Sequence, residues 1–228
     1  MAQPTLSDYQ QSTWSDSSTT EATASITWGA GDLIIVLGMT EDDPKTLNTP
    51  TATGLTFSAV SGTPTNASSS CKGYAWTSTA GSSGSGVISA TTTGGNGARG
   101  LAAFVFSGSD GVGGTAISTT LGSTTVQSLT RTGDNSHVVQ VWGDWNAVND
   151  TTVTWTPGSE TQRVAQYMAG RATFFVANWG DQGASGTTDY GFSGFAGGDM
   201  TAITIEVLGG SGGGAASRQS LMMMGMGR

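Results

Sequence analysis

The chain has 228 residues, of which 36% are hydrophobic and only 11% are charged, and 36 of them are Gly. Eight Lys and Arg stand against 16 Asp and Glu, which gives a formal net charge of −8. Nucleic-acid recognition requires clustered basic side chains, so we do not expect a nucleic-acid partner. The 7 Trp, 7 Phe and 4 Tyr favour a folded chain with a polar, mostly uncharged surface over a disordered one.

Cysteine and histidine each occur once, as Cys71 and His137. A single cysteine cannot form an internal disulfide, and Cys71 with His137 is too small a ligand set for a zinc site. We therefore expect no cofactor and no zinc or similar metal. The first residues lack the basic and apolar segments of a secretory signal, and no apolar run approaches the ~20 residues of a membrane span. We therefore expect a soluble polypeptide that is made in the cytoplasm and has no membrane partner.

The first predicted strand covers residues 22–28, where apolar residues alternate with Thr and Ser. Alternation with a period of two is typical of a strand with one buried face. After a Gly-rich turn, residues 33–37 form a continuous apolar run. This run indicates a central strand covered on both faces, although a short buried helix would show the same pattern.

Further short alternating segments follow, separated by Gly, Ser, Asn and Asp. The predicted strands are residues 55–60, 73–79, 86–92, 101–106, 115–120, 124–130, 137–142, 152–155, 163–168, 172–178 and 201–208. Many short strands without a long segment of helical period predict an all-β protein, an antiparallel β-sandwich of jelly-roll type.

The two ends of the chain differ in composition from the middle. Residues 1–20 are rich in Ser, Thr and Asp and are predicted to form an extended N-terminal arm, followed by the β-sandwich domain at 21–208. Residues 209–228 begin as a Gly-rich linker and end in an apolar, Met-rich segment. Because Met adapts to irregular grooves, this tail is a candidate docking element, unless it folds back on its own domain. Its proposed docking residues are Leu221, Met222, Met223, Met224 and Met226.

Catalytic candidates are weak throughout the chain, and we expect no enzyme. His137 stands at the start of a predicted strand, but Ser residues are so frequent that a Ser/His/acid coincidence carries no weight. Glu160 and Glu206 are possible paired carboxylates, but nothing in their spacing indicates that they converge. The acidic triplet at 41–43 is interpreted as a solvated turn, with a calcium site as the alternative.

Four tryptophans in the second half of the chain offer a binding hypothesis. Flat aromatic side chains can stack on sugar rings, so these residues are candidates for a glycan-binding platform. The competing interpretation is that at least half of them pack in the core. The proposed glycan contacts are Trp142, Trp145, Trp155 and Trp179.

Several segments together resemble jelly-roll virion proteins of tailed bacteriophages. The resemblance rests on the Thr/Ser-rich arm, the stretch from Trp28 to Leu37, the strand at 73–76, the segment at 104–108 and the closing strand at 200–208. It is a likeness of pattern over residues 20–208 and carries over no functional residue. It implies a virion location and a structural role, as a capsid decoration protein or a tail accessory protein.

The function expected from the sequence is therefore structural and non-enzymatic. The expected partners are other virion proteins, either capsid or tail subunits, and further copies of the same chain in a homo-oligomer. The alternative is a carbohydrate-binding module or host-surface adhesin that uses exposed tryptophans, with a host-surface glycan as the partner.

Overall fold

A computed structural model describes residues 2–41, 45–65, 71–95, 97–118, 125–145, 152–195 and 200–210. Within these ranges every regular element is a β-strand, and all strand pairs are antiparallel. The expectation of an all-β, antiparallel sandwich is therefore confirmed. The described ranges also contain no helix with the length and hydropathy needed to cross a membrane.

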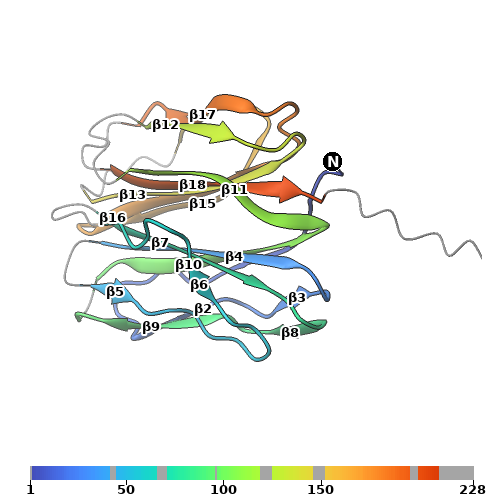
Figure 1. The fold of residues 1–228 in the computed structure, drawn as a ribbon. Helices are drawn as coiled ribbons and strands as arrows, with labels where there is room; N and C mark the ends of the chain where they lie inside the picture. Colours follow the sequence, from blue (N-terminus) through green and yellow to red (C-terminus); the bar gives the residue numbers. More distant parts are fainter. Residues whose placement is uncertain are drawn as a thin grey trace, which may run out of the picture.

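Two five-stranded sheets form the middle of the described structure and are called the inner sheets (Figure 1). In sheet order, the first contains β1 (Thr5–Gln11), β10 (Arg99–Ser107), β4 (Leu33–Thr40), β7 (Lys72–Thr79) and β6 (Ser58–Ala59). The second contains β11 (Ser109–Ser118), β18 (Met200–Gly209), β13 (His137–Asp144), β16 (Ala172–Trp179) and β15 (Glu160–Met168).

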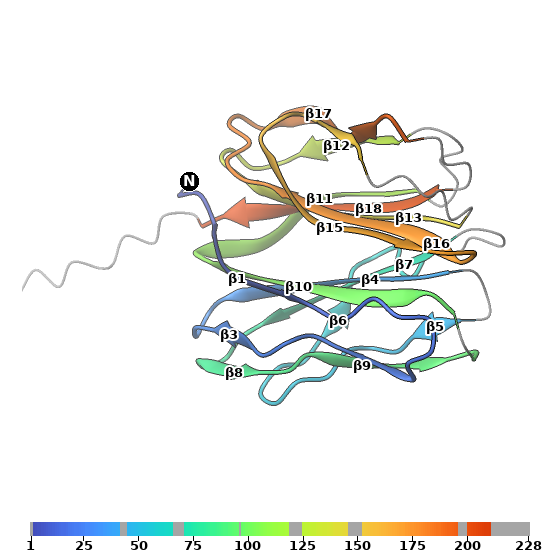
Figure 2. The same ribbon diagram turned by 180° about the vertical axis from the view of Figure 1, so that it is seen from behind.

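Further strands cover the far face of each inner sheet, so that the molecule is built of stacked β-layers (Figures 1 and 2). Over the first inner sheet lie β2 (Thr20–Ala22), β9 (Ser89–Thr93) and β5 (Thr46–Leu47), next to the pair β3 (Ile26–Trp28) and β8 (Gly84–Gly86). Over the second lie β12 (Val126–Arg131), β17 (Gly186–Ser193) and β14 (Thr154–Thr156). We call these the outer sheets.

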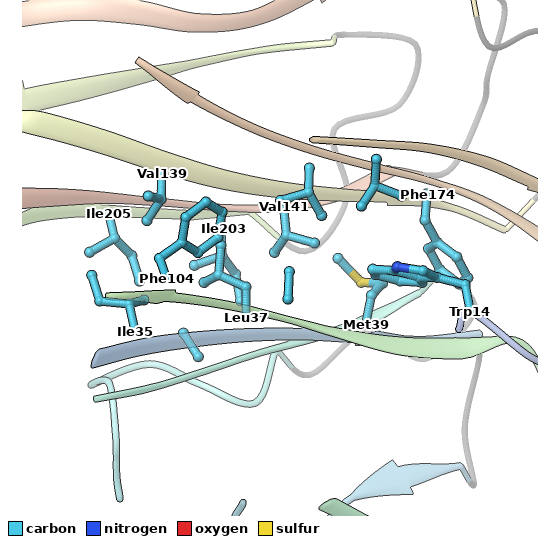
Figure 3. Packing of buried hydrophobic residues seen from close by; sticks show 14 of the residues in the cluster. Trp14, Ile35, Leu37, Met39, Phe104, Val139, Val141, Phe174, Ile203 and Ile205 are labelled. Atoms are coloured by element: carbon cyan, nitrogen blue, oxygen red, sulfur yellow. The ribbon is translucent and has the colours of Figure 1, made fainter. Parts of the chain in front are cut away.

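The layering explains the continuous apolar run in β4. Its residues Ile35 and Leu37 face the second inner sheet, where they meet Val139, Val141 and Ile203 (Figure 3). Its alternate residues, at 34 and 36, face the outer sheet and belong to a separate cluster. Both faces of β4 are therefore buried, as the sequence predicted.

A glycine allows the two inner sheets to approach closely. A Cβ added to Gly143 on β13 would lie 2.7 Å from Met39 Cγ and 2.8 Å from Cys71 Cβ. Real Cβ atoms do not approach neighbours this closely, so any larger residue at 143 would push β13 away from the first inner sheet.

The two halves of the chain have the same strand order. In the first half the inner order is β1-β10-β4-β7-β6 and the outer order is β2-β9-β5; in the second they are β11-β18-β13-β16-β15 and β12-β17-β14. If β3 and β8 are set aside, the strands of the first half correspond one to one, in chain order, with those of the second. The described structure thus consists of two halves with the same strand arrangement. The inner sheet of the first half faces the inner sheet of the second half.

The predicted boundaries differ from the structure in the first part of the chain. The first predicted strand is divided into β2 and β3, and part of the predicted N-terminal arm, Thr5–Gln11, is the edge strand β1, which pairs with β10. The proposed docking residues Leu221, Met222, Met223, Met224 and Met226 lie outside the described residues.

Candidate functional site

Three of the four tryptophans considered for a glycan platform are buried, in agreement with the competing interpretation that at least half of them pack in the core. Trp142, Trp155 and Trp179 are 1%, 7% and 0% exposed, and all three belong to the cluster between the second inner sheet and its outer sheet. Trp155 packs edge to face against Trp179, with ring centroids 5.6 Å apart. Buried rings offer no face to a sugar, so the hypothesis of four glycan contacts is corrected to a core-packing role for three of them.

Trp145 differs from the other three. It follows the end of β13 and is 40% exposed, and within the described residues only it and Val87 are exposed large hydrophobic residues. Strand alternation could identify which tryptophans share a face, but it could not reveal that a further sheet covers that face.

His137 is part of a buried polar network that joins the two halves. Asn178 Oδ1 accepts a hydrogen bond from Arg163 Nε at 2.7 Å, which directs the amide nitrogen of Asn178 toward His137 Nε2, 3.0 Å away. The imidazole therefore accepts at Nε2. Arg163 also lies over the ring of Tyr9 on β1, with its Cζ 5.0 Å from the ring centroid.

Burial and the positive charge of Arg163 together lower the pKa of His137 to about 4. The imidazole is consequently neutral at physiological pH. The Asn178 amide donates to it, and the ring of Phe106 lies edge to face against it, with centroids 4.8 Å apart. Among the described residues, no carboxylate orients it as a catalytic base requires. The arrangement supports the interpretation of His137 as a structural residue.

The two carboxylates considered for glycoside cleavage have different environments. Glu206 on β18 is 0% exposed, and its carboxylate accepts hydrogen bonds from the backbone of Gly114, Thr132 and Gly133 and from Thr132 Oγ1, at 2.7 to 3.0 Å. Burial raises the pKa of this carboxyl, but these hydrogen bonds lower it by more, so it lies below its usual range. Glu206 is therefore an ionised anchor for strand β11 and for the segment that follows β12, whereas Glu160 begins the edge strand β15.

Glu41 is not the solvated acidic turn residue that the sequence suggested. It is 4% exposed, and its carboxylate contacts Lys45 Nζ at 2.6 Å, Arg171 at 3.3 Å and the backbone N–H of Ala98 at 2.7 Å. Asp42 and Asp43 lie outside the described residues. Among the residues that are described, no group of three or more His, Cys, Asp and Glu side chains is arranged to hold a metal ion.

The two ends of the described chain meet at one place. The backbone N–H of Ala2 donates to the carbonyl of Gly210 at 3.1 Å, and Gly210 N–H donates to Gly108 O at 2.8 Å. The approach is so close that a Cβ on Gly209 would lie 2.2 Å from the carbonyl oxygen of Ala2. The start of β1, the link between the halves and the end of β18 therefore share one end of the molecule, beside the labelled N-terminus in Figures 1 and 2.

This juxtaposition could not be inferred from the sequence. Residue 2 precedes β1 and residue 210 follows β18, and these strands belong to different inner sheets, so the two residues become neighbours only because the inner sheets stack. We call this region, residues 2–5, 107–109 and 209–210, the termini end. Comparisons of the chain with protein-family models, with curated proteins and with solved structures find no match.

Proposed function

We propose that the chain is a non-enzymatic virion structural protein of a tailed phage, displayed on the capsid or the tail and held by its terminal segments. The observation that carries the proposal is the termini end, where Ala2 and Gly210 are hydrogen-bonded. A protein tethered through both ends at one place presents the rest of its surface outward. The jelly-roll assignment belongs to the same proposal and is supported by the sequence resemblance.

Chain composition supports the same function. After Gly210 the sequence continues with a Gly-rich stretch and then the apolar Met-rich segment. A Gly-rich connection followed by apolar Met side chains has a composition that suits insertion into a groove on a neighbouring subunit. The low charge content also reduces the desolvation cost when many copies pack side by side.

Cross-linking mass spectrometry on the native source material tests the proposal. We expect the protein to co-purify with a large particle and the N-terminal amine to cross-link to a different polypeptide. Cross-links confined to single chains, from a protein that sediments as a monomer apart from any particle, would contradict it.

A further inference from the structure

The edges of the two inner sheets differ in how well they are protected against pairing with another chain. An edge strand has unpaired N–H and C=O groups along one side, and proteins protect such edges by short strands, bulges, charged residues or a covering segment. The edge strands of the inner sheets are β1, β6, β11 and β15. Their lengths, registers and neighbours show which edge is open.

The first three of these edges are protected. Strand β6 has only two residues, Ser58–Ala59. Strand β1 has a register shift, and the carboxylate of Asp8 ties it to β3 by accepting a hydrogen bond from the N–H of Thr27 at 2.8 Å. Strand β11 has two register shifts, and it lies so close to β12 that a Cβ on Gly114 would be 2.2 Å from the carbonyl oxygen of Thr130.

Strand β15 is the long edge of the second inner sheet. It has nine residues, and its register shift lies near its start, between Gln162 and Val164. The rest of the strand, Val164–Met168, pairs regularly with β16 and contains no charged residue, Gly or Pro. Within the described part of the chain, no strand pairs with its other side. We call Val164–Met168 the open edge.

The two charged residues of β15 lie outside the open edge. Glu160 is the first residue of the strand. Arg163 directs its guanidinium into the molecule, where it donates to Asn178 and lies over the ring of Tyr9. In the repeated strand order the counterpart of β15 is the two-residue strand β6, so only the second half has an edge of this length.

The side chains of the open edge are complementary to a second copy of the same segment. Val164 is buried in the core between the inner sheets and Met168 packs against that core, while Gln166, between them on the same face, is exposed. An antiparallel pair with a two-fold axis at Gln166 places Val164 of one copy opposite Met168 of the other. It also places the two Gln166 amides opposite each other, where each can donate to the other.

We propose that the open edge pairs with the open edge of a second copy of this chain, so that the second inner sheets of the two molecules join into one antiparallel sheet. Every strand pair in the described fold is antiparallel, so the new pair continues the same ladder type. This inference gives a surface to the homo-oligomer expected from the sequence. It is independent of the proposed virion role, because it uses none of the residues at the termini end.

Sedimentation equilibrium and hydrogen exchange of the full chain, both measured against protein concentration, test the pairing. We expect the unmodified protein to be in a monomer–dimer equilibrium, with amides of the open edge becoming protected as the dimer forms. Gln166→Lys places two like charges opposite each other at the axis, so it should weaken the dimer about tenfold. An equimolar mixture of Gln166→Lys and Gln166→Glu should dimerise again, because the two-fold register places these side chains opposite each other.

Val87→Lys is the matched control, because it adds the same charge at an exposed position of the first half, and it should dimerise as the unmodified protein does. Residue 166 is exposed, so its variants should fold, and thermal unfolding verifies this. The proposal is overturned if the unmodified protein stays monomeric at submillimolar concentration, or if folded Gln166→Lys dimerises with unchanged affinity. None of these measurements involves a particle, so their failure is distinct from failure of the virion role.

Discussion

At the scale of single residues, buried polar groups connect parts of the chain that are far apart in sequence. The contact of Tyr9 with Arg163 and the hydrogen bonds from Arg163 to Asn178 and onward to His137 link the first strand to the second half. Burial of a polar group costs free energy unless the group is hydrogen-bonded, so removal of one member of this network should destabilise the fold.

His137 should make stability depend on pH. Its folded pKa of about 4 lies below the ~6.5 of an unfolded histidine, because burial and Arg163 disfavour the charged form. The unfolded chain therefore takes up a proton first, and the stabilisation is full above pH ~6.5 and is lost as the pH falls toward 4. We expect this group alone to lower the free energy of unfolding by about 3 kcal/mol over that range.

Urea denaturation at several pH values between 7 and 4, with His137→Gln as the comparison, measures this effect. The variant should lose less stability on acidification than the unmodified protein. Parallel pH profiles for the two proteins would show that His137 does not contribute.

At the scale of the elements, Trp155 fastens the outer sheet of the second half. Its ring contacts Phe175 and Trp179 of β16 and Phe192 of β17. Truncation of a buried aromatic residue removes its transfer free energy and leaves a cavity. Trp155→Ala should therefore cost about 3–5 kcal/mol of unfolding free energy.

Trp145→Ala provides the control for that substitution, because Trp145 is 40% exposed. Its effect should stay within about 0.5 kcal/mol, as is usual for surface positions. Equal losses in the two variants, measured by urea denaturation, would contradict the assignment of Trp155 to the core.

Most inner strands could be predicted from the sequence, because their apolar residues either alternate or run continuously. The expected strands at 73–79, 101–106 and 172–178 correspond to β7, β10 and β16. The edge strand β1 and the outer strand β17 were missed. Their sequences are rich in Gln, Thr, Asp and Gly, and they are strands because each pairs with a segment distant in sequence.

The sites were less predictable than the strands. Whether a tryptophan is exposed depends on how many layers are stacked, and periodicity along a single strand does not carry that information. The termini end likewise depends on how the two inner sheets stack. The tail, which carried the docking hypothesis, lies outside the described residues.

At the scale of the whole molecule, the two repeated halves share one core. The cluster between the inner sheets combines Ile35 and Phe104 from the first half with Val141 and Ile205 from the second (Figure 3). Unfolding of either half would expose the apolar face of the other. We therefore expect a single cooperative transition.

Scanning calorimetry measures this cooperativity. The calorimetric enthalpy should equal the van't Hoff enthalpy. Leu101 is buried on β10 in the first half, and Leu101→Ala should lower the midpoint of the same transition as Trp155→Ala in the second half. Two separate transitions, each shifted by only one of these substitutions, would show that the halves fold independently.

We propose that the protein is held in a particle through its terminal segments, and the incorporation of tail variants into particles tests this proposal. The unmodified protein is compared with a variant in which Leu221, Met222, Met223, Met224 and Met226 are replaced by Ser, and with Arg218→Ala as the control. We expect the Ser variant to fold but to be lost from purified particles, while the control is incorporated normally. Incorporation of the Ser variant at the level of the unmodified protein would show that these residues do not hold it.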